Sequence, residues 1–237
     1  MPNSLSRSVA IVGATGLIGG MLLQRLIEWQ QTTGEQLVVC ARRKPEGLSD
    51  NIVFIDLTNT DWQEKLAQYS ITHAFNCLGT TIKVAKTREA FRAVDHDLVM
   101  DFARTAQQAG AGFFSTVSSL GASESSPAFY SRVKGEVERE LKQMNFDHLA
   151  IWRPSLLVGD RKEERFGEDL GQVAFKLLNL LLLGPLEKYQ SIQAEWVAKA
   201  MFAESQLTQL TESDKELSKG VCVYHKPQIK QFSNSIK

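Results

Sequence analysis

A tyrosine and a lysine stand four residues apart in the segment Tyr-Ser-Arg-Val-Lys, at Tyr130 and Lys134. Side chains at this spacing share one face of a helix, so the lysine ammonium lies beside the tyrosine phenol. A neighbouring positive charge favours the phenolate and lowers the tyrosine pKa from its ordinary value of ~10. Such a phenol can pass a proton to a substrate oxygen while a cofactor delivers a hydride. Because the same spacing also occurs on ordinary surface helices, the surrounding sequence must decide between the two interpretations.

Two adjacent serines, Ser118 and Ser119, follow an apolar run at residues 113–117 and precede the tyrosine. A serine hydroxyl on a loop beside the helix can polarise the oxygen that receives the proton. Either serine could face a substrate, and we favour Ser119. We therefore predict Ser119, Tyr130 and Lys134 as the catalytic residues.

A glycine triplet, Gly13, Gly16 and Gly19, follows a β-branched run at residues 9–12 and leads into an amphipathic segment at residues 21–29. In a dinucleotide site the first glycine permits a tight turn, the second lets the backbone approach a pyrophosphate, and the third lets helix and strand pack closely. The positive end of the helix then faces the phosphates. An ordinary strand and helix with tolerated glycines is the alternative, which the flanking strand and helix disfavour.

Two arginines, Arg42 and Arg43, end the second apolar run at residues 37–40. NAD sites carry an acidic residue at this place, about 20 positions beyond the glycines, to bind the ribose 2′-hydroxyl. Here Cys40 and Ala41 occupy it. Paired guanidinium groups suit a 2′-phosphate, and no carboxylate is present to repel it. The sequence therefore predicts NADP(H) rather than NAD, against the alternative of an exposed basic turn.

Further polar and small residues follow the next two apolar runs. Asp56, after residues 52–55, is placed either to accept a hydrogen bond from the adenine amino group or to cap a turn. Leu78 and Gly79, at the end of the run 73–78, would pass close under the nicotinamide ribose, where a glycine permits close approach.

These residues lie at the ends of strands that alternate with helices. Strands are expected over residues 9–12, 37–40, 52–55, 73–78, 113–117, 149–152 and, at a sheet edge, 221–224. Helices are expected over residues 21–29, 61–68, 88–108, 128–144, 170–183 and 194–207. The alternation predicts an α/β fold, a Rossmann-type doubly wound parallel sheet with helices on both faces. Ligands in such sheets bind at the carboxyl ends of the strands.

The long middle helix has its own apolar pattern. Over residues 88–108 the expected buried stripe consists of Phe91, Val94, Leu98 and Phe102. Gly110 and Gly112 mark the end of that helix.

We find no linker or repeat, so residues 1–237 are expected to form a single domain. Its core spans about residues 8–153, and residues 154–237 form a small extension on the substrate side. The polar stretches 211–219 and 228–237 are expected to be mobile.

The composition narrows the classes of partner. Lysine plus arginine equals aspartate plus glutamate, 27 each, so no overall field attracts nucleic acid or an anionic membrane. Cys40, Cys77 and Cys222 lack the spacing of metal ligands, so no metal is expected. The most apolar segment, residues 173–186, is shorter than the ~20 residues of a membrane span. Residues 1–8 lack an apolar signal core, and we expect a soluble, cytoplasmic protein.

Taken together, the chain resembles the atypical branch of the short-chain dehydrogenases/reductases, and more closely the Tat-interacting-protein-like oxidoreductases related to the NmrA-like group. The similarity covers about residues 8–165. The matching segments occur in the same order and comprise residues 13–19, 40–43, 76–81, 94–97, 118–122, 130–138 and 146–154.

The resemblance implies an NADPH-binding Rossmann-type fold and assigns the contacts by position. The residues that would contact the pyrophosphate are Thr15, Gly16, Leu17 and Ile18. Those that would hold the 2′-phosphate are Arg42 and Arg43, and the nicotinamide side would be lined by Leu78, Gly79, Tyr130 and Lys134. The positions that help to close over the cofactor are Leu157 and Arg165. Arg165 can also be interpreted as a solvated charge within the run 161–165.

The chain departs from the family pattern at one position. Many catalytic relatives carry an asparagine in the long middle helix that organises a proton-relay water, whereas this chain has Asp95. The carboxylate could cap a backbone, pair with a nearby base or be structural.

The predicted function is that of an NADP(H)-dependent oxidoreductase that reduces a small carbonyl compound or oxidises the alcohol, with Tyr130 as proton donor and Lys134 as its support. The alternative is a non-catalytic NADP(H)-binding regulator that senses redox state and acts through a protein partner. A nucleotide-sugar epimerase or dehydratase needs a larger C-terminal lobe than the region after Arg153 provides.

A homodimer is a further expectation. It would form through the apolar stripes of the helices expected at residues 128–144 or 170–183. The residues that motivate the second of these are Leu177, Leu178, Leu181 and Leu182.

Overall fold

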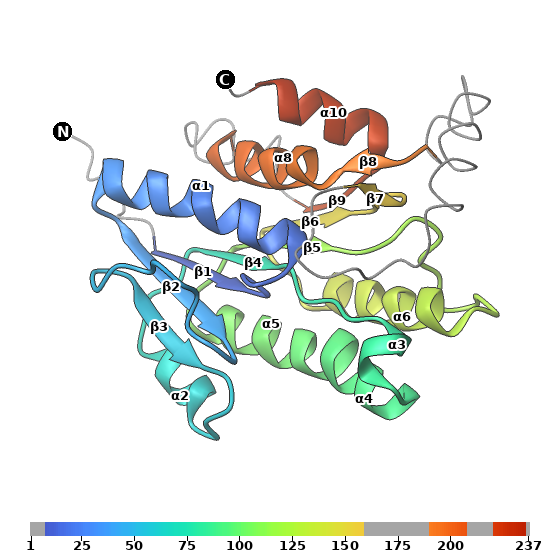
Figure 1. Ribbon diagram of the computed structural model, residues 1–237, viewed down its shortest axis with the longest axis horizontal. Helices are drawn as coiled ribbons and strands as arrows, with labels where there is room; N and C mark the ends of the chain where they lie inside the picture. Colours follow the sequence, from blue (N-terminus) through green and yellow to red (C-terminus); the bar gives the residue numbers. More distant parts are fainter. Residues whose placement is uncertain (1–7, 159–189, 208–219, 236–237) are drawn as a thin grey trace.

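A computed structural model describes residues 8–158, 190–207 and 220–235 and shows one central sheet between two layers of helices (Figure 1). The sheet has seven strands in the order β3-β2-β1-β4-β5-β6-β9, and every neighbouring pair is parallel. The strands are β1 (Ser8–Val12), β2 (Gln36–Ala41), β3 (Val53–Asp56), β4 (His73–Asn76), β5 (Phe113–Val117), β6 (His148–Trp152) and β9 (Gly220–Tyr224). The chain runs outward from β1 to β3 and then crosses back to β4, which places the switch in strand order between β1 and β4. The predicted Rossmann-type doubly wound fold is confirmed.

Helices cover both faces of the sheet (Figure 1). On one face lie α1 (Leu17–Thr33), α8 (Ala194–Leu207) and α10 (Lys226–Ser235). On the other lie α2 (Trp62–Ala67), α5 (Leu98–Gln108) and α6 (Phe129–Gln143). Two short helices, α3 (Ile82–Ala85) and α4 (Arg88–Arg92), precede α5, and β7 (Leu157–Val158) pairs with β8 (Ile192–Gln193) in a separate small sheet. Among the residues described, no helix combines the length and the apolar composition that crossing a membrane requires.

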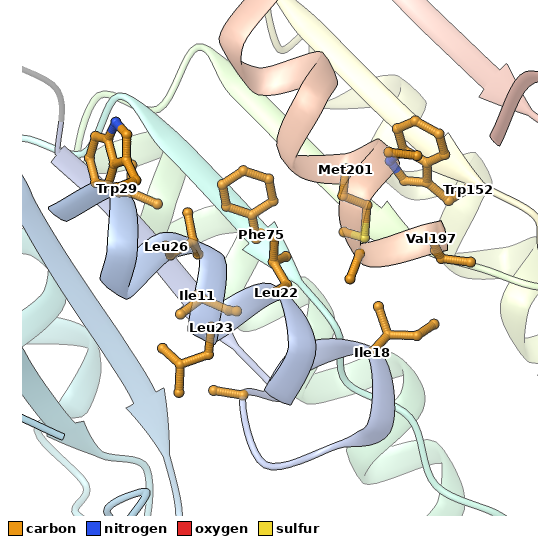
Figure 2. Packing of buried hydrophobic residues seen from close by; sticks show 14 of the residues in the cluster. Ile11, Ile18, Leu22, Leu23, Leu26, Trp29, Phe75, Trp152, Val197 and Met201 are labelled. Atoms are coloured by element: carbon orange, nitrogen blue, oxygen red, sulfur yellow. The ribbon is translucent and has the colours of Figure 1, made fainter. Parts of the chain in front are cut away.

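A separate apolar cluster lies on each face of the sheet. On the first face, Leu22 and Leu26 of α1 pack with Phe75 of β4, and α8 contributes Val197 and Met201 (Figure 2). All five side chains are at most 1 % exposed. Full burial of such a side chain contributes about 1.5–3 kcal/mol, so this cluster fixes α1 and α8 against the strands.

The helix predicted over residues 88–108 contains an irregular turn. Between α4 and α5 the chain forms a single π-helical turn, η1 (Ala93–Asp97). A π-helical turn bonds residues five apart rather than four, which rotates the following residues around the axis. As a result Asp95 and Val99 are buried, whereas Val94 and Leu98 are only half-buried. The predicted stripe is confirmed at Phe91 and Phe102 and in part at Leu98, which packs against the second apolar cluster, but it was wrong at Val94.

The end of the chain is helical where a mobile tail was expected. Residues 228–235 belong to α10, in which Ile229 is fully buried. The Phe232 ring meets Trp152 and Tyr224 edge-on, at centroid distances of 5.7 and 5.1 Å. Two apolar side chains three residues apart thus anchor this polar helix, and the buried Lys226 adds a hydrogen bond to Gln190. Residues 211–219 lie outside the described part of the chain.

We expect Ile229→Ala to lower the free energy of unfolding by about 2–5 kcal/mol, because it removes a fully buried side chain from under α10. Chemical denaturation measures the change. The neighbouring exposed Lys230 supplies the control, since Lys230→Ala is expected to change the same quantity by less than about 0.5 kcal/mol. Equal effects of the two substitutions would contradict the packing described for α10.

Candidate active site

The glycine turn after β1 packs directly against the end of β4. Gly13 has a φ of 78°, and a Cβ built on it would lie 2.4 Å from the carbonyl carbon of Cys77. A Cβ on Gly19 would lie 2.1 Å from the Gly13 carbonyl oxygen. No side chain fits at either position, so Gly13 and Gly19 serve the packing of the turn itself.

Gly16 immediately precedes α1 as its N-cap, and both Thr15 and Gly16 are exposed. The Gly16 amide donates to the Gly13 carbonyl oxygen at 3.0 Å, and the first turn of this 17-residue helix carries no acidic residue. The positive end of α1 is therefore available to an anion. Leu17 is half-buried, and Ile18 points into the core, where it is 6 % exposed (Figure 2). Only the Ile18 backbone can thus contribute to the predicted pyrophosphate contact.

The expected adenosine end lies after β2 and β3. Arg42 and Arg43 are both exposed, and neither forms an ion pair with a carboxylate of the described residues. Asp56 lies opposite Ala41 in the parallel register. Its Oδ1 accepts hydrogen bonds from the amide and the hydroxyl of Thr58, both at 2.8 Å, and these bonds lower the pKa of Asp56. Asp56 therefore caps a turn, as one of the two interpretations predicted, and both bonds use the same oxygen.

The turn after β4 is fixed by buried hydrogen bonds. The Asn76 amide group donates to the Thr116 hydroxyl at 2.9 Å, and Asn76 Oδ1 accepts from the Leu78 amide at 3.1 Å. The next residue, Gly79, is exposed to solvent. A Cβ built on it would contact only Asp95, whose Oδ1 would lie 3.8 Å away. Packing within the described chain does not require a glycine at this position, so the open space beside it is available to a ligand.

Tyr130 and Lys134 lie on α6, one turn apart, as predicted. Tyr130 is in the first turn and 40 % exposed, with its ring edge-on to Phe91 at 5.9 Å. Lys134 is buried, and its ammonium lies 2.9 Å from Asp95 Oδ1. Burial by itself would lower the pKa of Lys134, but the attraction of the Asp95 carboxylate, together with that of Tyr130 and Glu138, raises the pKa above its ordinary value. Lys134 is therefore a cation at neutral pH.

The two candidate serines differ in their surroundings. Ser118 is buried, and its hydroxyl donates to Glu138 Oε1 at 2.5 Å. Glu138 in turn accepts two hydrogen bonds from the Arg153 guanidinium, at 2.9 and 2.5 Å. Ser119 is half-buried, and its hydroxyl makes a long bond of 3.3 Å to the Leu120 carbonyl oxygen. Since Ser118 is committed to the Glu138 carboxylate, the geometry favours Ser119 as the serine that can face a substrate.

The sequence did not lead us to expect that the loop between β5 and α6, residues 118–128, packs closely on α6. A Cβ on Gly135 would lie 2.2 Å from the Ser123 carbonyl carbon, and the Ser123 amide donates to the Ser131 carbonyl oxygen at 3.0 Å. A glycine inside a helix costs about 0.5–1 kcal/mol, so its presence next to Lys134 was the available signal for a close approach.

Two predicted cofactor contacts, Leu157 and Arg165, and the two predicted dimer stripes remain to be placed. Leu157 lies in β7 opposite Ile192 of β8 and packs partly against the first apolar cluster. Arg165 and the stripe at residues 170–183 lie outside the described residues.

The apolar stripe of α6, which was one of the two proposed dimer surfaces, is buried within this chain, because Val133, Val137 and Leu141 are at most 4 % exposed. It offers no surplus apolar face, and the homodimer stays a prediction.

Two of the three cysteines are buried thiols of low reactivity. All three are free, and burial raises the pKa values of the Cys40 and Cys77 thiols to about 12. A thiolate is therefore not formed at neutral pH at these two positions. Among the residues described, no group of histidine, cysteine, aspartate and glutamate side chains is arranged to hold a metal ion.

Comparison with known proteins agrees with this architecture. The chain matches the NAD-dependent epimerase/dehydratase family over residues 9–193. It is 35 % identical to Protein HTATIP2 of Rattus norvegicus, over 72 % of this chain and 71 % of the relative. It is 34 % identical to the mitochondrial protein FMP52 of Candida glabrata, over 70 % of this chain and 72 % of the relative.

Solved structures show the same fold. A UDP-glucose 4-epimerase superposes with a TM-score of 0.63 at 13 % identity, covering 97 % of this chain and 81 % of that one. The NAD complex of the UDP-glucose 4-epimerase from Thermus thermophilus gives a TM-score of 0.61 at 16 % identity, covering 96 % and 82 %.

The names of the fungal relatives correct one expectation. Proteins from Aspergillus terreus and Candida glabrata that align with this chain are named mitochondrial, which contradicts the cytoplasmic location expected from the sequence. That expectation rested on the missing apolar signal core. A mitochondrial transit peptide is amphipathic and rich in arginine and serine rather than apolar, so the missing core does not test for one.

We expect Ser118→Ala to lower the free energy of unfolding by about 1–3 kcal/mol, because it leaves the buried Glu138 carboxylate short of one donor. Ser119→Ala is the matched control, since its half-buried hydroxyl makes only a long bond, and we expect a change below about 0.5 kcal/mol. Chemical denaturation of both variants provides the measurement. A larger loss from Ser119→Ala would reverse the roles assigned to the two serines.

Proposed function

Because this chain belongs to the NAD-dependent epimerase/dehydratase family, as an atypical short-chain dehydrogenase/reductase with an NAD(P)-binding Rossmann fold, we propose that it is an NADP(H)-dependent oxidoreductase. Its substrate is a small carbonyl compound, or the alcohol in the reverse direction. One observation carries the proposal: Tyr130 is exposed on α6, one helical turn from the buried cation Lys134, whose partner Asp95 lies beside Gly79.

The residues present fit a dinucleotide phosphate. The amino end of α1 has the positive dipole that a pyrophosphate requires, and its first turn carries no acidic residue. Arg42 and Arg43 are the residues proposed to hold the 2′-phosphate, since both are exposed and free of carboxylate partners among the described residues. Asp56 retains Oδ2 for the adenine amino group while Oδ1 caps its turn. Gly79 leaves room for the nicotinamide ribose.

The bound cofactor would supply the hydride, and the chain's own residues would handle the proton. In the reductive direction the Tyr130 hydroxyl donates its proton to the carbonyl oxygen as the carbonyl carbon receives the hydride, which leaves an alcohol and a tyrosine phenolate. Lys134 stabilises the phenolate, and water returns the proton to it. The Ser119 hydroxyl donates a hydrogen bond to the same oxygen. Oxidation runs through the same groups in reverse.

We expect the chain to bind NADPH more tightly than NADH, and the double substitution Arg42→Ala/Arg43→Ala to remove most of that preference. Each hydrogen bond to a charged group contributes about 1.5–3 kcal/mol, so NADPH affinity should fall at least about tenfold while NADH affinity changes little. Titration calorimetry with both cofactors measures this. Lys44→Ala, at the neighbouring exposed lysine, is the control. An equal loss for both cofactors would contradict the assignment of the 2′-phosphate to these arginines.

We expect Tyr130→Phe to reduce kcat at least about 100-fold, because it removes the proton donor, while NADPH affinity stays within about threefold. The measurement is NADPH consumption with a panel of aldehydes, ketones and quinones, paired with cofactor titration. Turnover that survives the substitution would refute the role of Tyr130.

The regulator alternative predicts a different result for the unmodified protein. It would bind NADPH tightly and consume none of it with any carbonyl compound. The names of the two relatives at about one-third identity state no reaction, so this experiment decides between enzyme and sensor.

A further inference from the structure

A buried carboxylate on α6 holds the loop that carries the two candidate serines. Glu138 is 2 % exposed, and its Oε1 accepts the Ser118 hydroxyl at 2.5 Å. The Arg153 guanidinium binds both oxygens of the same carboxylate, Oε1 at 2.9 Å and Oε2 at 2.5 Å. Arg153 is itself fixed at the end of β6, because its amide donates to the Tyr224 carbonyl oxygen of β9 at 2.8 Å. One carboxylate therefore ties Ser118 to both α6 and the end of β6. We call Ser118, Glu138 and Arg153 the serine clamp.

The backbone on both sides of Ser119 is fixed as well. The Ser118 amide donates to the Trp152 carbonyl oxygen at 2.7 Å, and the Leu120 amide donates to the Pro154 carbonyl oxygen at 2.9 Å. Ser119 stands between these two anchored residues, yet within the described chain its own hydroxyl makes only the long bond to the Leu120 carbonyl oxygen. The fold thus fixes the position of Ser119 and leaves its hydroxyl available to a ligand.

The helix that carries the proposed proton donor also carries the clamp. Tyr130, Lys134 and Glu138 are spaced four residues apart, so they lie along one side of α6. The serine loop meets the same helix a second time, where its backbone packs on Gly135. One helix therefore sets the placement of the Ser119 hydroxyl relative to the Tyr130 phenol.

The serine clamp uses full charges where neutral groups would be cheaper to bury. Removing a carboxylate and a guanidinium from water is costly, and well-packed apolar residues usually serve stability as well as a buried ion pair does. A hydrogen bond to a charged group is shorter and stronger than one between neutral groups, and a guanidinium that binds both carboxylate oxygens fixes the carboxylate in one orientation. The pair of Glu138 and Arg153 therefore suits the exact placement of the Ser118 hydroxyl better than it suits stability alone.

We propose that Glu138 is a positioning residue for Ser119, and that Ser118 and Arg153 transmit its effect to the serine loop. The proposal rests on the proposed function, in which the Ser119 hydroxyl donates to the carbonyl oxygen that Tyr130 protonates. The clamp acts on the reaction through Ser119: it holds the neighbouring residue, and so directs the Ser119 hydroxyl at that oxygen. A loosened clamp lowers kcat and leaves the binding of the cofactor unchanged, because misplacement of one polarising group weakens the transition state alone.

The hold on the loop can be tested without any reaction. Ser118→Ala removes the clamped hydroxyl and retains the ion pair of Glu138 and Arg153, so the variant is expected to fold. We expect amide hydrogen exchange over residues 118–123 to become at least about fivefold faster. Ile229→Ala is the control, since it loosens the core under α10 and should leave exchange in this loop within about twofold. Unchanged exchange in Ser118→Ala would overturn the proposal.

A double-mutant cycle tests whether the clamp acts through Ser119. With NADPH and the best carbonyl substrate, Ser118→Ala should lower kcat about tenfold and Ser119→Ala about 100-fold, while NADPH affinity stays within about twofold. In the Ser119→Ala background, Ser118→Ala should change kcat by less than about twofold, because the clamp then has no hydroxyl to direct. A merely structural role would lower kcat by the same factor in both backgrounds, which would refute the proposal. Ile229→Ala again provides the control and should leave kcat unchanged.

The two measurements separate this proposal from the proposed function. Faster exchange without any NADPH consumption would refute the proposed reaction and support the serine clamp as the group that fixes the loop. Consumption of NADPH with unchanged exchange, or with equal effects in both backgrounds, would support the reaction and refute the role of Glu138.

Discussion

The close backbone contact between the turn after β1 and the end of β4 is the constraint on which the candidate site depends. It exists because Gly13 and Gly19 lack side chains, so that the Gly13 carbonyl can lie between α1 and the Cys77 backbone. The contact brings the amino end of α1 and the Leu78–Gly79 turn to the same point in the sheet, where the strand order switches. Since ligands of doubly wound sheets bind at such a point, one steric condition positions both halves of a dinucleotide site.

The catalytic side is organised by paired buried charges rather than by backbone contact. α6 contributes Lys134 and Glu138, one turn apart, and each finds a partner on another element, Asp95 in η1 and Arg153 after β6. Removing one member of such a pair typically costs about 3–5 kcal/mol, because it leaves a buried charge without compensation. The two pairs therefore fix the rotation of α6 against the sheet, and with it the direction of Tyr130.

Much of this arrangement could be predicted from local sequence patterns. The parallel strands, the glycine turn and the spacing of Tyr130 and Lys134 each depend on residues that are close in the chain, so periodicity and turn chemistry suffice to find them. The π-helical turn, which depends on what Asp95 meets across the fold, left no signal in the apolar pattern. The sequence also provided no means to distinguish Ser118 from Ser119, because the carboxylate that binds Ser118, Glu138, lies 20 residues further along the chain. The helix at α10 escaped prediction for a similar reason, since its Phe232 packs on Trp152 of the sequence-distant strand β6 as well as on nearby Tyr224.

The two ends of the site handle charge in opposite ways, and burial explains why. Arg42 and Arg43 are exposed, so water solvates their charges. They are therefore stable without a carboxylate partner and remain accessible to an anionic group. Lys134 has no such solvent, and Asp95 is the main group that stabilises it as a cation. A neutral pair beside an exposed tyrosine gives the chemical end little attraction for anions, whereas the open arginines give the other end a strong one. In the proposed function, this difference in charge would orient the nucleotide cofactor before its nicotinamide contacts the site.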